Sequence, residues 1–90
     1  MLSHSRVRIA IEGPSVRNVL AKGIAVDLHP SAFPIGRFAQ TGLHHTGIFL
    51  ERCGEERYEL FLPRTFAASI WDWLVDAALP LGYEVNIEEE

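Results

Sequence analysis

Four residues in the first half of the chain carry side chains that commonly bind divalent metals. Asp27 and His29 lie in one apolar segment, and His44 and His45 form an adjacent pair further along. Carboxylate and imidazole groups are ordinary zinc ligands, but adjacent histidines in a strand point to opposite faces and would share an ion only around a bulge. The pair could also relay a proton, yet the sequence places no second titrating group beside it. We expect no metal site here, and contacts of these side chains with loop backbone or with a partner protein instead.

Cys53 and the residues before the second predicted helix are two further candidates for chemistry. A nucleophilic cysteine needs a base or a helix N-terminus that lowers the pKa of its thiol. Cys53 lies instead in a predicted hairpin turn with Glu55 and Glu56, whose charges disfavour the thiolate. Residues 63–65 precede a helix whose N-terminus, with Arg37, could bind a carboxylate or a phosphate, but a plain helix cap with a solvated arginine is commoner. We therefore expect no catalytic residue.

A long segment with no helical or strand period, residues 24–37, is the main candidate for binding another protein. Connections of this length are usually functional or disordered. This one is rich in apolar side chains, and Pro30 and Pro34 restrict its backbone. The segment must bury its side chains either on its own core or against another protein. We expect it to dock through Asp27-Leu28-His29-Pro30 and Phe33-Pro34.

Two tryptophans lie two residues apart in the second predicted helix, so they diverge by about 200° around its axis. Trp73 belongs to the apolar stripe of that helix. Trp71 points to a flank, where it either packs under a strand edge or anchors a partner, since tryptophan often dominates binding energy. The full set of residues that we expect at a partner interface is Asp27, His29, Phe33, Pro34, Arg37, Phe49, Phe61 and Trp71.

These residues must be positioned by six predicted elements. Residues 7–12, 47–52, 57–62 and 83–88 read as strands, the middle two joined as a hairpin. Residues 16–22 and 65–79 read as helices, with Ser15 and Thr65 as N-caps. The apolar stripe of the second helix contains Phe66, Ile70, Trp73, Leu74 and Ala77. The order β-α-β-β-α-β is that of ferredoxin-like domains, an α+β fold with a four-stranded antiparallel sheet and both helices on one face.

The alternation of side chains assigns each strand residue to one face of this sheet. The face toward the helices should carry Val7, Ile9, Ile11, Ile48, Leu50, Tyr58, Leu60, Leu62, Tyr83, Val85 and Ile87. The opposite face should carry Arg8, Ala10, Glu12, Phe49, Phe61, Glu84 and Asn86. Two neighbouring phenylalanines on an open face indicate a surface that another molecule covers.

The composition indicates one small domain over residues 1–90, with an acidic tail at 88–90. A net charge of −4 and the scattered arginines disfavour nucleic-acid binding, which needs a basic stripe. The apolar runs are far too short to span a membrane, and the first residues lack the apolar core of a secretory signal. A single cysteine suits a reducing compartment. We expect a soluble, cytoplasmic protein.

Two segments carry a family resemblance. GIAVDLHPSAFPIGRFAQT (Gly23 to Thr41) and LFLPRTFAASIWDWL (Leu60 to Leu74) resemble the gamma subunit of heterotetrameric sarcosine oxidases. The opening VRIAIEGPSVRNVLAKG (Val7 to Gly23) is similar to the start of the same segment. The resemblance covers nearly all of this chain but only the later part of a gamma subunit. Gamma subunits are in turn similar to folate-binding aminomethyltransferase domains, in which this β-α-β-β-α-β unit is one lobe.

The resemblance implies a subunit of a flavin-dependent enzyme that oxidises an N-methyl or secondary amino acid and passes formaldehyde to tetrahydrofolate. In that family the flavins, nucleotide, folate and zinc sit on other subunits, and gamma has no recognised catalytic residues. We therefore expect a small non-catalytic subunit of a sarcosine oxidase-like amine oxidase or dehydrogenase, with no activity alone, that acts through protein contacts. The alternative is a free-standing domain of one-carbon metabolism that binds folate or a small acid, as a homodimer.

Overall fold

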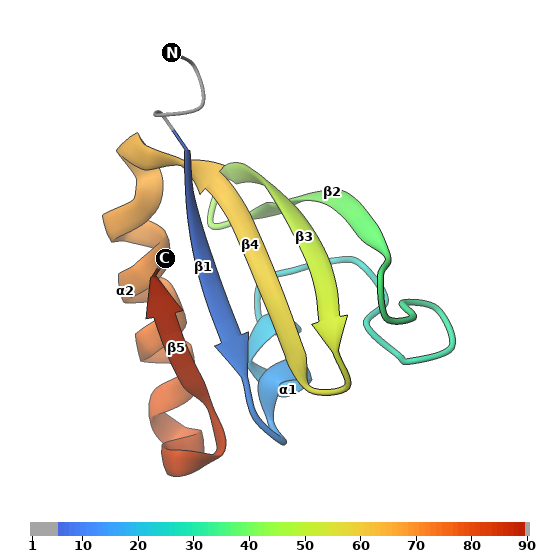
Figure 1. Cartoon of the computed structure of the whole chain (residues 1–90). Helices are drawn as coiled ribbons and strands as arrows, with labels where there is room; N and C mark the ends of the chain where they lie inside the picture. Colours follow the sequence, from blue (N-terminus) through green and yellow to red (C-terminus); the bar gives the residue numbers. More distant parts are fainter. Residues whose placement is uncertain (1–5, 90) are drawn as a thin grey trace.

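The computed structural model of the chain describes residues 6–89, except for the side chains of residues 82–84 (Figure 1). Its elements follow in the order β1 (Arg6–Glu12), α1 (Val16–Leu20), β2 (Phe38–Leu43), β3 (Thr46–Gly54), β4 (Arg57–Pro63), η2 (Arg64–Phe66), α2 (Ala67–Ala78), η3 (Leu79–Glu84) and β5 (Asn86–Glu89). None of the helices in this described part is long and apolar enough to cross a lipid bilayer.

The strands form one antiparallel sheet in the order β2-β3-β4-β1-β5. Helices α1 and α2 lie behind this sheet in Figure 1, on the same face. The α+β class and the antiparallel sheet with two helices are confirmed. The predicted number of four strands is one too few, because Phe38–Leu43 adds an edge strand beside β3. The sequence predicts no element for these residues, which lie between the long loop and the next predicted strand.

The hydrophobic core fills the space between the helices and the inner face of β1, β3 and β4. Leu60 lies at its centre, opposite Leu50 on one neighbouring strand and Ile9 on the other. The inward residues predicted for β1, β3 and β4 are all buried: Val7, Ile9, Ile11, Ile48, Leu50, Tyr58, Leu60 and Leu62. From α1, Val16, Val19 and Leu20 complete this layer, as their spacing predicts.

Helix α2 buries Ile70, Leu74 and Ala78 against the sheet. Two predictions about its beginning are wrong. Phe66 belongs to the 3₁₀ turn η2 and is 46% exposed instead of joining the core stripe. Thr65 lies inside the same turn, and the N-cap of α2 is Phe66. The 3₁₀ turn precedes the α-helix and rotates Phe66 away from the stripe that an unbroken α-helix would give.

The last strand is shorter than predicted and begins at Asn86. Residues Leu79–Glu84 form the 3₁₀ helix η3, with Pro80 in its first positions. Glu88 and Glu89 are exposed, as predicted for an acidic tail, but they belong to the strand β5. The predicted faces of Tyr83 and Glu84 concern side chains outside the described residues, as does the predicted tail position of residue 90.

Candidate partner-binding surfaces

Three phenylalanines form a patch on the open face of the sheet. Phe49 on β3 lies directly opposite Phe61 on β4, as the alternation predicts. Phe38, on the added strand β2, places its ring 5.5 Å from that of Phe49 and 5.8 Å from that of Phe61. Phe49 and Phe61 are half-buried and Phe38 is 53% exposed. We call Phe38, Phe49 and Phe61 the aromatic patch; sequence reasoning missed Phe38 because it missed β2.

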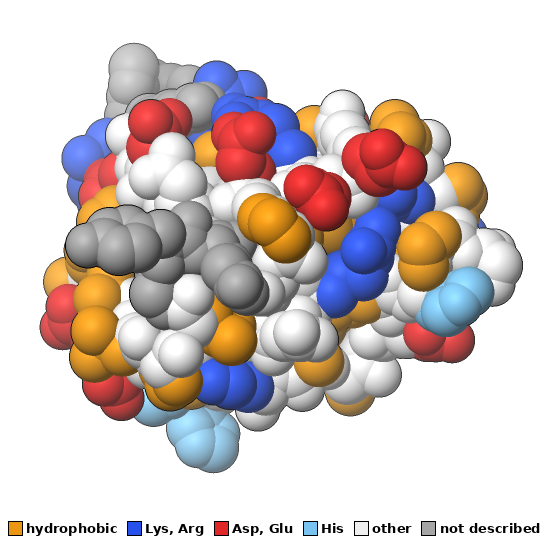
Figure 2. Space-filling view, turned by 90° about the horizontal axis from the view of Figure 1, so that it is seen from below, with side chains coloured by type: hydrophobic (Ala, Val, Ile, Leu, Met, Phe, Trp, Pro, Cys, Tyr) orange, Lys and Arg blue, Asp and Glu red, His pale blue; other side chains and the backbone are white. Residues whose placement is uncertain are grey.

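The charges beside the aromatic patch are largely paired with each other. The guanidinium of Arg57 lies 2.8 Å from Glu12 and 3.1 Å from Glu59, and Arg8 lies 3.6 Å from Glu59. The hydrogen bond to Glu59 raises the pKa of Arg57 above its usual value, so this cation stays charged. Arg6 instead lies over the ring of Phe49, 5.3 Å from its centre. Figure 2, which views the molecule from below, shows acidic and basic side chains intermixed with hydrophobic ones.

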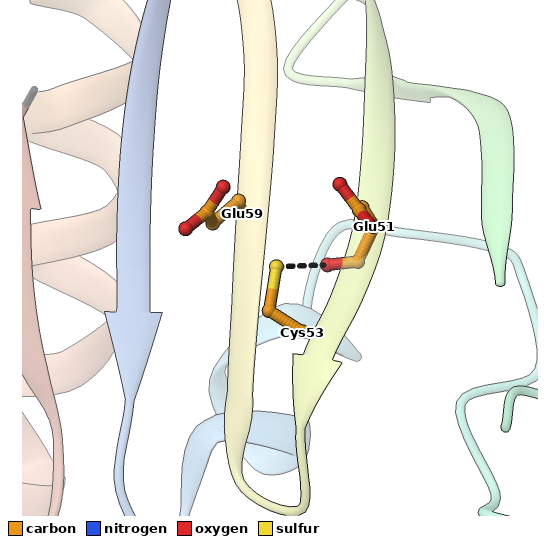
Figure 3. Close-up of side chains that lie close together, drawn as sticks. All are labelled: Glu51, Cys53 and Glu59. Carbon is orange, nitrogen blue, oxygen red and sulfur yellow. Dashed lines mark hydrogen bonds between the residues drawn. The ribbon is translucent and has the colours of Figure 1, made fainter. Parts of the chain in front are cut away.

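Glu51, Cys53 and Glu59 bring three potential metal ligands within 4.8 Å of one another on the same open face (Figure 3). The Cys53 thiol lies 3.9 Å from the main-chain oxygen of Glu51, to which it donates a weak hydrogen bond. Burial and the negative charges of Glu59 and Glu51 raise the pKa of Cys53 from 9.0 to about 11. The sulfur is therefore a thiol at neutral pH, and arginines already pair with Glu59. Such a thiol does not act as a thiolate nucleophile.

The exposed loop residues that we predicted at a partner interface make hydrogen bonds within the loop itself. The carboxylate of Asp27 accepts a hydrogen bond from the His29 backbone N–H at 3.0 Å, and the His29 ring lies 2.8 Å from the Ser31 hydroxyl. Pro34 is exposed, and its carbonyl accepts from the Arg37 N–H at 3.0 Å. These side chains are exposed and can meet a partner, but those of Asp27 and His29 also make hydrogen bonds within the loop.

Phe33 is fully buried, so its placement at a docking surface is a correction. Its ring belongs to the core cluster and lies 5.9 Å from the ring of Tyr58. The guanidinium of Arg37 covers it from outside, 5.9 Å from the ring centre. Leu28 and Ile24 are buried in the same cluster. The loop therefore packs on its own domain through these apolar residues.

Arg52 is the structural residue that sequence reasoning missed. It is only 5% exposed and donates three hydrogen bonds to main-chain carbonyls. Its acceptors are Phe33 at 3.1 Å in the loop, and Gly54 and Glu55, both at 3.0 Å, in the β3–β4 turn. The available signal was its position two residues after Leu50, which puts it on the inner face of β3.

His44 and His45 form the two-residue turn between β2 and β3. Leu43 pairs with Thr46, and both histidines have positive φ, 52° and 66°. This is the backbone pattern of a type I′ turn, which asparagine and glycine usually occupy. The two rings lie 6.0 Å apart and the side chains are exposed. The pair therefore lies in a turn rather than in a strand.

Trp71 lies far from the aromatic patch in the fold, on the helix side of the sheet. It is half-buried and lines a hollow of about 230 Å³ between α2 and β5. Trp73 is half-buried too, and its ring packs so closely on Gly23 that a Cβ there would lie 2.5 Å from it. The structure therefore brings together Phe49 and Phe61, and it leaves Trp71 on a separate surface.

Comparisons with known proteins place this fold. The family model described as sarcosine oxidase, gamma subunit family, matches residues 2–80. A chain of the heterotetrameric sarcosine oxidase from Corynebacterium sp. U-96, in complex with pyrrole 2-carboxylate, is 34% identical, with a TM-score of 0.82. That match covers 84% of this chain but only 39% of the relative. No curated protein sequence gives a significant match.

A second solved structure shares the fold at lower identity. The glycine cleavage system aminomethyltransferase T from Bartonella henselae is 23% identical, with a TM-score of 0.81 over 96% of this chain and 24% of that one. The family model spans most of the sequence, and both solved structures reproduce the arrangement of strands and helices. The chain belongs to the sarcosine oxidase gamma subunit family.

Proposed function

We propose that this chain is a small non-catalytic subunit of a sarcosine oxidase-like, flavin-dependent amine oxidase or dehydrogenase complex. The single observation that carries the proposal is the family match over residues 2–80. The 34% identical relative, whose match covers 84% of this chain, is part of a heterotetrameric sarcosine oxidase. Without the edge strand β2, the strands follow the order β5-β1-β4-β3, which supports a ferredoxin-like unit. The open face of such a sheet is available for contact with other subunits.

The aromatic patch is the surface that we assign to partner subunits. Phe38 projects from the open face with more than half of its area exposed, beside Phe49 and Phe61. Exposed aromatic clusters of this kind are typical of protein interfaces. Loop residues Asp27 and His29, which are exposed, are further candidates for this contact.

The flavin and the tetrahydrofolate of the proposed complex would sit on its other subunits. A site for either cofactor must enclose an apolar ring and bind an anionic tail. An open hollow of about 560 Å³ beside α2 is lined by Asp72 and Asp76, whose carboxylates repel phosphate and carboxylate groups. This hollow therefore does not fit either cofactor. The same charges disfavour it as a site for folate or a small acid in the alternative, a free-standing binding domain.

Cytoplasmic localisation is part of the proposal. The only cysteine, Cys53, is a free thiol, which suits a reducing compartment.

Co-expression tests the proposed function. The tagged chain would be produced together with the flavoprotein subunits of a sarcosine oxidase-like complex from the same genome. We expect a complex of fixed stoichiometry that carries flavin absorbance. Failure of these subunits to copurify, with the chain itself folded, would overturn the proposal.

A pair of matched variants tests the aromatic patch within this complex. Phe38→Ala should weaken assembly by about 30-fold, since a hot-spot aromatic contributes at least about 2 kcal/mol. Phe66→Ala removes a similarly exposed ring, 46% against 53%, outside the patch and should leave assembly unchanged. Equal effects of the two changes would show that the patch is not the interface.

A further inference from the structure

A second surface runs along α2, the helix that lies behind the sheet in Figure 1, whereas the aromatic patch lies on the open face of the sheet. The hollow between α2 and β5 is lined by Trp71, Val75, Ala78, Leu79, Val85 and Ile87, which we call the α2 groove. Leu79 is 68% exposed and Val75 is 37% exposed. Trp71 and Val75 also line the adjoining hollow that reaches His44 in the β2–β3 turn. The groove therefore offers a tryptophan wall and two exposed aliphatic side chains in one continuous strip.

Carboxylates border this apolar strip. Asp72 and Asp76 are both exposed and lie one helical turn apart, so they repel each other. The sequence of α2, AASIWDWLVDAA, contains no basic residue. Among residues 6–89, no ion pair or hydrogen bond involves either carboxylate. On β5, Glu89 is exposed and lies on the same face as Ile87.

This combination fits one kind of occupant. A segment with apolar side chains would bury them against Trp71, Val75 and Leu79, and flanking cations would meet the carboxylates. A second copy of this chain fits poorly, because a two-fold axis at the groove would bring Asp72 and Asp76 against their own equivalents. An anionic lipid surface or a nucleic acid would be repelled by the same charges.

We propose that the α2 groove binds an amphipathic segment of a partner protein in which lysine or arginine flanks apolar residues. The site is separate from the aromatic patch, and it does not depend on the identity of the complex. A chain with both surfaces can hold two partners at once, one on the open face of the sheet and one along α2.

The two tryptophans make the groove directly observable. Trp71 and Trp73 are the only ones in the sequence, and both border this surface. The probe is a synthetic amphipathic peptide without tryptophan, with leucine on one face and lysine on its flanks. A matched peptide carries glutamate in place of each lysine. We expect saturable changes in tryptophan emission with the lysine peptide, weaker at high salt, and none with the glutamate peptide.

Matched charge variants decide whether the carboxylates beside the groove are responsible. Asp72→Asn with Asp76→Asn should weaken lysine-peptide binding about tenfold, as expected for two exposed ion pairs. Glu55→Gln with Glu56→Gln makes the same change in net charge at the exposed β3–β4 turn and should leave the affinity unchanged. Three results would overturn the proposal: no emission change, equal binding of both peptides, or equal loss in both variants. A dimer of the chain that alters tryptophan emission would overturn it too.

Discussion

The guanidinium of Arg52 lies inside the domain, where charged groups are seldom found unless they are paired. Its acceptors are carbonyls from two segments that are distant in sequence, the loop at Phe33 and the β3–β4 turn at Gly54 and Glu55. Arg17 of α1 donates to the same Glu55 carbonyl at 2.9 Å. The buried cation of Arg52 therefore holds the long loop, residues 24–37, in place together with the apolar residues of the loop.

Arg52→Met should therefore destabilise the domain strongly. The change keeps most of the volume but removes three hydrogen bonds to main-chain carbonyls, of which that of Glu55 keeps its second donor, Arg17, at a cost of about 3 kcal/mol. For a domain of this size that corresponds to a fall in melting temperature on the order of 15 °C. Arg6→Met is the matched control, since Arg6 is exposed and stacks on Phe49. If both variants melted at the same temperature as the unchanged chain, that result would contradict the role of Arg52.

The buried ring of Phe33 leads to a second prediction. Phe33→Ala removes a fully buried aromatic from the core and should reduce the free energy of unfolding by about 3–5 kcal/mol. Small domains have only about 5–15 kcal/mol in total. Thermal melting followed by circular dichroism measures the loss. A variant that melts normally but fails to bind a partner would instead restore Phe33 as a docking residue.

Cys53 gives a prediction for alkaline pH. Its folded-state pKa of about 11 exceeds the ordinary value of 9.0. The unfolded chain therefore releases this proton first as pH rises, and this contribution to stability is complete below pH 9 and lost as pH passes through about 11. Denaturant melts between pH 8 and pH 11 should show the decline, and Cys53→Ser should reduce it. Alkylation of the native thiol should be slow at neutral pH; fast alkylation of the folded protein would contradict the raised pKa.

At the scale of elements, β2 and the turn that follows it are the main addition to the expected fold. The strand alternates exposed and half-buried residues and buries only Leu43. The turn at His44-His45 forces two histidines into positive φ, a conformation that costs free energy in residues other than glycine. The strand nevertheless contributes Phe38, the most exposed ring of the aromatic patch.

Replacing His44-His45 by Asn-Gly should stabilise this hairpin. Asparagine and glycine adopt type I′ geometry readily, so we expect a gain of about 1 kcal/mol in the free energy of unfolding. The midpoint of urea denaturation measures it. His44→Ala with His45→Ala keeps the strain and serves as control, with no gain expected. A destabilised Asn-Gly variant would mean that the histidine side chains make contacts the fold requires.

The sequence predicted the elements whose residues follow a strong period. The inner faces of β1, β3 and β4 and the buried face of α1 follow directly from apolar alternation or helical spacing. It failed where structure depends on main-chain geometry. The 3₁₀ turn at Phe66, the His-His turn and the start of β5 leave no apolar period. The inward position of Arg52 was not predicted, because a charged residue interrupts the apolar alternation by which an inner face is recognised.

At the scale of the whole molecule, the two exposed apolar surfaces lie on opposite sides of the sheet. The aromatic patch occupies the open face, and the α2 groove occupies the helix side. The matched relatives are longer chains, of which this one spans 39% and 24%. A small domain that exposes apolar residues on both sides is suited to lie between larger proteins.

We expect the purified chain to have no oxidase or transferase activity of its own. The Cys53 thiol is protonated, Glu12 and Glu59 are paired with arginines, and His44 and His45 lie in an exposed turn, so none of these groups is an activated nucleophile. Assays with N-methyl amino acids, added flavin and tetrahydrofolate should give no turnover. Substrate-dependent reduction of flavin by the chain alone would contradict this.

The position of β1 between β4 and β5 has a consequence for the order of folding. Strands β2 and β3 each pair with the next strand in sequence, whereas β1 pairs with the distant strands β4 and β5, with Arg6 opposite Pro63 of β4. Contacts that close such a long stretch of chain form slowly. During synthesis on a ribosome, the apolar face of β1, with Ile9 and Ile11, stays unpaired for on the order of several seconds until β4 has been made. The nascent chain therefore exposes an unpaired hydrophobic strand throughout that interval, and transiently exposed strands of this kind are prone to aggregate unless a chaperone covers them.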